Sequence, residues 1–173
     1  SVEPDGSRPI RFNGRQSLPG RPVIDKRRQP LCQESCPLGV NAQGYIALAR
    51  AGLYDEALDL IRKDNILPGI CGRICTHPCE EACRRGTLDE PVAIRDIKRF
   101  LADRQWTESA ENPTSVVFRS EKVAVIESGP AGLAAAADLA RFGYPVTVFE
   151  KEEKTGGMLR YGIGPWRLPR DVL

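Results

Sequence analysis

Residues 123–157 constrain the fold of this chain most, because strand, glycine turn, helix, strand and glycine pair follow one another closely. Residues 123–126 form a short apolar run, as expected of a strand that is buried on both faces. An alanine-rich helical run follows the turn, and a second apolar strand ends at Glu150. This order predicts a Rossmann-type βαβ unit, the start of an α/β domain that binds a dinucleotide.

The turn departs from the usual Gly-x-Gly-x-x-Gly pattern, because Glu127 stands where the first glycine is expected. Gly129 can still bring backbone N–H groups close to a pyrophosphate, and Gly132 can still let the helix approach the strand. The side chain and charge of Glu127 should weaken dinucleotide binding. Glu150 follows by about 20 residues, where a carboxylate meets the ribose diol. The candidate cofactor-binding residues are Gly129, Pro130, Ala131, Gly132, Glu150, Gly156 and Gly157.

The composition changes along the chain and predicts four parts. Residues 1–30 are rich in proline and glycine, which predicts an extended or flexible arm. Residues 31–106 hold the cysteines and several helical patterns, which predict an α-helical domain. Residues 107–121 are polar and predict a linker. Residues 122–173 begin the Rossmann-like domain but include only about one βαβ unit of it.

Three runs within the helical part have helical spacing of their apolar residues. Residues 41–52 and 54–65 predict two antiparallel helices joined by a short glycine turn. Residues 91–106 predict a third helix, which should begin at Pro91 with one of the two preceding acidic residues as its cap. The helical pair resembles a single repeat unit, but no second copy follows, so a repeat array is not expected.

Six cysteines suggest metal or redox chemistry, since thiolates are soft ligands for iron–sulfur clusters and zinc. The cysteines form two groups, one at residues 32–36 and a longer one at residues 71–83. Gly72 and Pro78 argue against one continuous helix through the longer group, so the chain should wrap around a metal there. Buried thiols without a ligand role are the alternative. His77, the only histidine, should have a local hydrogen-bonding or exposed role. The candidate metal ligands are Cys32, Cys36, Cys71, Cys75, Cys79 and Cys83.

Composition gives no reason to expect nucleic acid or membrane as a partner. The net charge is only +2 with 41% hydrophobic residues, and no apolar run approaches the roughly 18 residues of a membrane span. The polar N-terminal residues are unlike a secretory signal. We therefore expect a cytoplasmic protein, where cysteines favour metal or redox roles over structural disulfides.

Two blocks together resemble a known family: DNILPGICGRICTHPCEEACRRGTLDEPVAIRDIKRFLADR, and VAVIESGPAGLAAAADLARFGYPVTVFEKEEKTGGMLRYGI. They are similar to the small subunit of glutamate synthase, the N-terminal part of dihydropyrimidine dehydrogenase and related NAD(P)H-dependent FAD oxidoreductases. The resemblance covers roughly residues 31–173. It implies a helical domain with 4Fe–4S clusters, an α/β part that binds FAD and then NAD(P)H, and electron transfer to a partner subunit or domain.

The resemblance also implies a ligand pattern that this chain meets only in part. The family's first group has four cysteine ligands, and two of these positions fall on Ile24 and Arg27 here. The family's Glu or Gln ligand position falls on Lys98. None of these three residues is a suitable ligand. One cluster would keep Cys32 and Cys83, and the other Cys36, Cys75 and Cys79. The chain is therefore expected to hold one rearranged cluster, in which Cys71 could take part, or none.

Three functions remain open from the sequence. The first is the electron-entry part of an FAD- and NAD(P)H-dependent oxidoreductase, in which the flavin carries out the hydride chemistry. The second is a non-catalytic docking module whose cluster and nucleotide sites have degenerated. The third is a zinc-binding structural domain.

The short α/β part leads to a prediction about activity. With about one βαβ unit and no second nucleotide fold, the 173 residues alone should not turn over NAD(P)H. The measurement is NAD(P)H oxidase or dye-reductase activity with added FAD. Steady turnover above a protein-free control would contradict this expectation.

Overall fold

The computed structural model describes residues 11–12, 15–16, 29–107 and 119–173 of the chain. The chain divides into two compact units, residues 1–30 and residues 31–173. In the first unit, strands β1 (Arg11–Phe12) and β2 (Arg15–Gln16) pair antiparallel. The rest of the arm expected for residues 1–30, and most of the linker expected after residue 107, lie outside the described residues.

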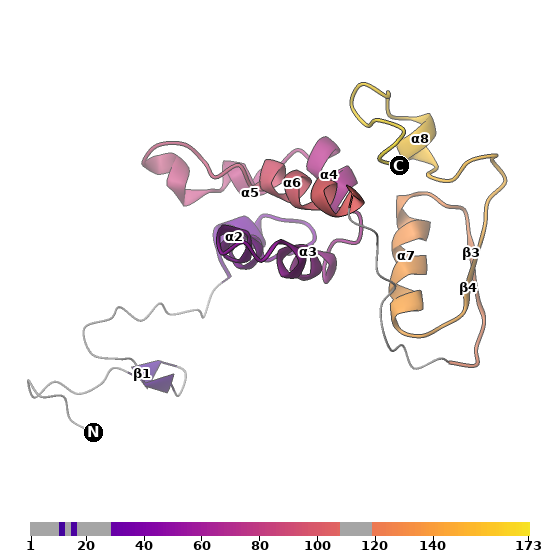
Figure 1. Cartoon of the computed structure of the whole chain (residues 1–173), viewed down its shortest axis with the longest axis horizontal. Helices are drawn as coiled ribbons and strands as arrows, with labels where there is room; N and C mark the ends of the chain where they lie inside the picture. Colours follow the sequence, from indigo (N-terminus) through magenta and orange to yellow (C-terminus); the bar gives the residue numbers. More distant parts are fainter. Residues whose placement is uncertain (1–10, 13–14, 17–28, 108–118) are drawn as a thin grey trace, which may run out of the picture. The chain divides into compact units, whose positions relative to one another are not determined.

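Helices make up residues 31–107 of the second unit, and the predicted antiparallel pair is present (Figure 1). Asn41 caps the first helix of this pair, since its side-chain oxygen accepts from the N–H of Gly44 at 2.9 Å. Gly52 forms the turn between the two helices with φ of 80°. The elements are α1 (Leu31–Glu34), α2 (Ala42–Arg50), α3 (Tyr54–Arg62), α4 (Pro68–Ile74), α5 (Pro78–Glu81), a 3-10 helix η1 (Arg84–Thr87) and α6 (Ile94–Thr107).

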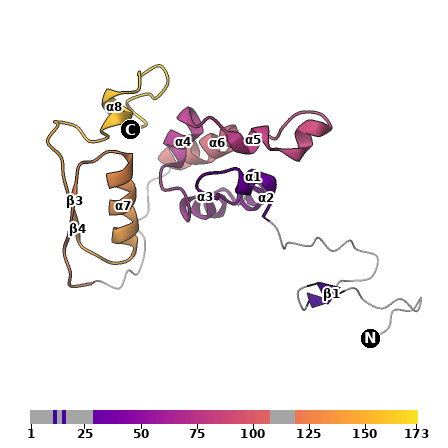
Figure 2. The ribbon, with the colours of Figure 1, turned by 180° about the vertical axis from the view of Figure 1, so that it is seen from behind.

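The hydrophobic core of the helical part lies where α2 and α3 pack on α6, and Figure 2 shows these helices from behind. Tyr45, Leu58, Ile61 and Leu101 are fully buried there. The hydroxyl of Tyr45 donates to the carbonyl oxygen of Ile94 at 3.0 Å, which satisfies this buried group and fixes α2 to the start of α6. The core extends to the cysteines, because Cys79 is buried within it and Cys32 and Cys36 pack against it.

Helix α6 begins at Ile94, so the start that the sequence predicted at Pro91 is wrong. Acidic residues 89–90 do not cap it either. The carboxylate of Glu80, on α5, accepts a hydrogen bond from the backbone N–H of Arg95 at 2.7 Å and so satisfies a free donor of the first turn. A cap that comes from another helix leaves no local pattern in the sequence.

The cysteine group at residues 71–83 does not lie on one continuous helix, as the sequence predicted. The interruption does not occur at Gly72. Helix α4 ends at Ile74, Cys75 is extended, and α5 begins at Pro78. Gly72 lies inside α4, where a Cβ atom would stand 2.8 Å from the Cβ of Arg99. This glycine therefore lets α4 pack closely along α6.

The second part of this unit is a βαβ unit with parallel strands, as predicted. Val123 pairs with Val146 and Ile126 with Phe149, and α7 packs on both strands. The expected burial of the first strand on both faces is wrong, because Ala124 and Ile126 are exposed, Ile126 to 72%. Phe149 on the second strand is 55% exposed. Helix α7 covers only one face of this sheet. The elements are β3 (Val123–Ile126), α7 (Pro130–Arg141), β4 (Val146–Phe149) and α8 (Met158–Tyr161).

None of the helices in the described ranges has both the length and the apolar character that crossing a bilayer requires.

Candidate functional site

All six cysteines are free thiols, and Cys79, Cys32 and Cys36 lie in or against the core of the helical part. Burial raises the pKa of Cys32, and repulsion from Cys83 and Cys36 raises it further. Burial also raises the pKa of Cys71 and of Cys79, and each of these two feels the charges of Cys36 and Cys75. We call the second neighbourhood the inner thiols: Cys36, Cys71, Cys75 and Cys79.

The inner thiols come from two parts of the chain. Cys71 is on α4, Cys75 directly follows that helix, Cys79 is on α5, and Cys36 follows α1. Helices α1 and α5 are in contact, as are α4 and α6. The described residues bring no three Cys, His, Asp or Glu side chains together as ligands of one metal ion. This arrangement gives no support to the zinc-binding alternative.

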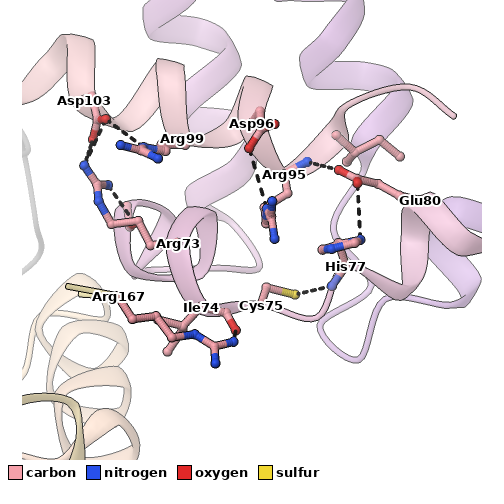
Figure 3. A network of polar contacts seen from close by, with 12 residues as sticks. Arg73, Ile74, Cys75, His77, Glu80, Arg95, Asp96, Arg99, Asp103 and Arg167 are labelled. Carbon is pink, nitrogen blue, oxygen red and sulfur yellow. Dashed lines mark hydrogen bonds and ion pairs between the residues drawn. The ribbon is translucent and has the colours of Figure 1, made fainter. Parts of the chain in front are cut away.

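His77 has a local role beside the inner thiols, as the sequence predicted (Figure 3). Its backbone N–H donates to the Sγ of Cys75 at 3.3 Å. Its ring Nδ1 lies 3.2 Å from Oε2 of Glu80, the residue that caps α6. His77 has φ of 52°, in the left-handed region, so the turn between the two cysteine helices is held in a conformation that few residues adopt. Hydrogen bonds to cysteine sulfur are one of the ways in which proteins tune iron–sulfur clusters.

Two buried polar side chains lie beside the inner thiols, and sequence reasoning missed their role. Lys98 is 6% exposed and Asn65 is 3% exposed. The Nδ2 group of Asn65 is buried and has no hydrogen-bond partner among the described residues. The charge of Lys98 acts on Cys71 and Cys79 and favours their thiolates. Its position four residues after Ile94 and three before Leu101, on the apolar face of α6, could have revealed its burial.

The amide of Asn65 tests whether an iron–sulfur cluster fits the thiols. A buried amide N–H without an acceptor is unfavourable unless a partner satisfies it. A 4Fe–4S cluster bound by thiolates is an anion, and its sulfur atoms accept hydrogen bonds. The residues therefore fit such a cluster, with soft thiolate ligands and the unpartnered amide N–H of Asn65, whose side chain contacts Cys71.

The glycines of the nucleotide turn lie in a tight arrangement of backbone. A Cβ atom at Gly132 would stand 2.1 Å from the carbonyl oxygen of Glu127, so only glycine fits there. A Cβ atom at Gly157 would stand 2.8 Å from the Cα of Gly129, so the glycine pair touches the turn. A Cβ atom at Gly129 itself would meet nothing within 4 Å. Open space thus lies in front of this residue, at the N-terminus of α7, where a phosphate is favoured.

The other turn residues that the sequence singled out are placed as follows. Pro130 and Ala131 form the first turn of α7, with Pro130 at the position where its missing N–H costs nothing. Gly156 donates its N–H to the carbonyl oxygen of Ser128 at 3.1 Å. Glu127 is exposed, and its backbone has φ of 73°, which is unfavourable for a residue with a side chain.

Glu150 ends β4 and is bound to the turn rather than left free. Its Oε2 accepts from the N–H of Ser128 at 2.9 Å and also from the hydroxyl of Ser128. Its Oε1 accepts from the N–H of Glu152 at 3.0 Å. Ser128 is fully buried, and sequence reasoning did not single it out. Its small hydroxyl side chain, placed between Glu127 and Gly129, could have indicated a hydrogen-bonding role in the turn. The Glu150 carboxylate thus orients the turn on which a dinucleotide would lie.

These hydrogen bonds predict a pH dependence of stability. Donation from the N–H of Glu152 and from Ser128 lowers the pKa of Glu150 from 4.5 to about 2. Because the pKa is lowered in the folded state, ionised Glu150 stabilises the fold above pH 4.5, and this contribution is lost as the pH falls towards 2. Glu150→Gln should therefore lower Tm at pH 7 and match the wild type near pH 2.

Thermal unfolding of both proteins across this pH range is the measurement. Glu153→Gln is the control, since Glu153 is exposed on the same loop. Equal Tm values for the wild type and Glu150→Gln at pH 7 would contradict the expectation.

Comparisons with known proteins match both parts of the chain. Residues 26–110 match the family described as dihydropyrimidine dehydrogenase domain II, 4Fe-4S cluster, and residues 125–162 match an NAD(P)-binding Rossmann-like domain. The NADP(+)-dependent formate dehydrogenase subunit beta of Moorella thermoacetica is 43% identical over 82% of this chain and 23% of its own length.

Two further relatives have the same pattern of coverage. The NADPH-Fe(3+) oxidoreductase subunit beta of Geobacter sulfurreducens is 42% identical over 87% of this chain and 23% of its own length. The glutamate synthase (NADPH) small chain of Mycobacterium tuberculosis is 39% identical over 82% of this chain and 29% of its own length. The chain thus spans about a quarter of the length of the curated relatives it matches.

Proposed function

Because this chain belongs to the family of oxidoreductase subunits that includes the glutamate synthase small chain, we propose that it is the electron-entry part of an NAD(P)H-dependent flavoprotein. In this proposal residues 31–106 hold an iron–sulfur cluster, and residues 122–173 begin the domain that binds FAD. NAD(P)H would be the electron donor of the whole protein. The docking-module alternative is not favoured, since the relatives carry the names of NADPH-dependent oxidoreductases.

The observation that supports this function most is the pairing of the thiols with an unsatisfied donor. The Nδ2 group of Asn65 is buried without a hydrogen-bond partner among the described residues, and Oδ1 of the same side chain lies 3.6 Å from the Sγ of Cys71. A docking module would have no need of a buried donor without a partner. An anionic cluster in an electron carrier would satisfy it.

The residues of this chain would have the following roles. Three thiolates, those of Cys36, Cys75 and Cys79, would hold the cluster, with a fourth ligand from Cys32, Cys71 or Cys83. The backbone of the turn would bind the pyrophosphate of FAD at the N-terminus of α7. Glu150 would hold the turn and accept hydrogen bonds from the ribose. When bound, the flavin supplies hydride chemistry, and the cluster supplies one-electron transfer. The turn residues are Gly129, Pro130, Ala131, Gly132, Gly156 and Gly157.

The partner and compartment follow from the same proposal. The printed names of the relatives describe them as a subunit beta or a small chain. We therefore propose that this protein passes electrons to a partner subunit or domain in the cytoplasm, with no role for nucleic acid or a membrane.

An optical spectrum with iron and sulfide analysis tests the proposal. The full chain, reconstituted with iron and sulfide under argon, should turn brown and retain both elements after desalting. Dithionite should then bleach the visible absorbance. A colourless protein without bound iron would contradict the proposed electron-carrying role and would favour the docking module.

Glu127 gives a prediction about FAD affinity. Its carboxylate stands at the turn where a pyrophosphate is expected, and its backbone has φ of 73°. In a protein extended through the whole flavin domain, Glu127→Gly should strengthen FAD binding by about fivefold, which corresponds to about 1 kcal/mol of charge repulsion at a solvated site.

Calorimetric titration with FAD is the measurement. Glu127→Gln separates the two causes, because it removes the charge and keeps the side chain. If Glu127→Gly binds FAD no better than the wild type, the turn tolerates Glu127 and this interpretation is wrong.

A further inference from the structure

The loop between α5 and α6 is exposed throughout and yet has a defined structure. Residues 84–90, which we call the Leu88 loop, are all exposed, and none of them belongs to a hydrophobic core cluster of the described residues. Figures 1 and 2 show this segment, beyond α5, at one end of the helical part. Its first four residues form η1. Burial of apolar surface within this chain therefore does not account for the order of the loop.

Local hydrogen bonds hold the loop in its shape. The guanidinium of Arg85 donates to both carboxylate oxygens of Asp89, from Nε at 2.8 Å and from Nη2 at 2.6 Å. The hydroxyl of Thr87 donates to the carbonyl oxygen of Arg84 at 2.8 Å. The backbone N–H of Leu88 donates to the carbonyl oxygen of Arg85, also at 2.8 Å. Because a bidentate pair fixes geometry as well as charge, the loop is preorganised before anything binds to it.

Leu88 is the one large apolar side chain of this loop. It is 88% exposed, although leucine is a residue that folding normally buries. A single exposed leucine has no significance by itself. A leucine on an ordered loop is different, because much of the conformational entropy that binding would remove has been lost already. Such a side chain suits the role of an anchor that enters an apolar recess of another protein.

The charges of the loop define the chemistry of a complementary surface. Arg85 and Asp89 neutralise each other. Arg84 is exposed and has no ion-pair partner among the residues that the structure describes. Glu90 is an exposed carboxylate at the other end of the loop. A matching protein surface would therefore have an apolar recess, with a carboxylate opposite Arg84 and a basic group opposite Glu90.

The loop begins beside the cysteines. Cys83 directly precedes Arg84, and its carbonyl oxygen accepts from the N–H of Gly86 at 3.0 Å. Helix α5 carries Cys79 and is in contact with α1, which carries Cys32. A protein bound to the loop would lie next to this part of the cysteine region. Electrons that leave the cysteine region would thus have a short path to that protein.

We propose that the Leu88 loop is the docking surface for the protein that accepts electrons from this chain. Leu88 enters an apolar recess of that protein, and Arg84 pairs with a carboxylate at the edge of the recess. This inference rests on the proposed electron-carrying function and names the surface through which the partner binds. The pair of Arg85 and Asp89 holds the loop ready for this contact.

Photochemical crosslinking identifies the protein that the loop contacts. The whole flavoprotein, produced in its own cells with the variant Leu88→p-benzoylphenylalanine, should crosslink on illumination to a protein other than itself. The same probe in place of Leu53, an exposed leucine between α2 and α3, is the control and should not capture that protein. Once purified, the captured protein should be reduced by NAD(P)H in the presence of the wild type.

Electron transfer to the captured protein tests the anchor. Leu88→Asp should raise the concentration of that protein needed for half-maximal transfer by about tenfold, because a charged side chain does not enter an apolar recess without cost. The maximal rate, the reduction of a dye and Tm should equal those of the wild type, since the side chain of Leu88 is exposed. Leu88→Met should restore binding, and Leu53→Asp should change none of these values.

The outcomes separate this inference from the proposed function. If the wild type binds no cluster and reduces no dye, both fail. If it does both and the probe at position 88 captures nothing, or only a second copy of this chain, the inference alone is overturned. Capture of a protein that accepts no electrons would also overturn it, as would half-saturation of Leu88→Asp at the wild-type concentration.

Discussion

Replacing Cys75 with alanine should abolish the iron–sulfur absorbance of the reconstituted chain, whereas replacing His77 with alanine should leave it. Cys75 ends α4 in an extended conformation, and its sulfur accepts the backbone N–H of His77 at 3.3 Å. His77→Ala keeps that N–H, since it belongs to the backbone. The imidazole Nδ1 lies 3.2 Å from Oε2 of Glu80. Cys75→Ala therefore removes a proposed ligand, whereas His77→Ala removes a contact to Glu80 and no proposed ligand.

The measurements are the visible absorbance of the iron–sulfur cluster and the number of iron atoms bound per chain. Cluster assembly should also order the segment 71–83, because ligand bonds replace the core that such an irregular segment lacks. Protease protection of this segment upon reconstitution would report that ordering. Full iron content in Cys75→Ala, or loss of the cluster in His77→Ala, would contradict the expectation.

Gly132→Ala should destabilise the βαβ unit strongly, while Gly129→Ala should leave its stability unchanged. The new Cβ atom at Gly132 would stand 2.1 Å from the carbonyl oxygen of Glu127, so the turn or the helix must move. Overpacking of this kind costs about 1–3 kcal/mol or more. At Gly129 the backbone has φ of −66°, and a Cβ atom would meet nothing within 4 Å.

Gly129→Ala should instead affect the binding of FAD. Gly129→Ala places a methyl group in the open space where a phosphate is expected, so it should weaken FAD binding in the extended protein without a change in Tm. Thermal unfolding and calorimetric titration measure the two effects. Equal Tm values for Gly132→Ala and the wild type would show that the turn is looser than its contacts indicate.

Periodic sequence patterns predicted the longer helices well, and the reason is physical. The helical pair and most of α6 bury a regular apolar face, with residues such as Leu58, Ile61 and Leu101 at helical spacing. The four-residue helices α1 and α8 were not foreseen, because so short an element has no periodicity to recognise. The start of α6 was wrong since its cap, Glu80, comes from a different helix.

The candidate site was predictable in its residue types but not in its surroundings. Cysteine spacing pointed to a ligand role, and the glycine pattern pointed to the turn. The burial of Lys98 was not expected, since lysine is almost never fully buried without a partner. Ser128 was missed because a hydrogen bond to Glu150 depends on the pairing of two strands. Contacts that require tertiary structure are absent from local patterns.

The single covered face of the β3–β4 sheet has a consequence for handling this protein. Ile126 and Phe149 lie side by side on the face that α7 does not cover, and both are exposed. Within the described residues, each strand also has one edge without a hydrogen-bonding neighbour. An apolar face beside open strand edges is a template for strand addition between molecules. Self-association that increases with protein concentration should therefore limit how far solutions of this chain can be concentrated.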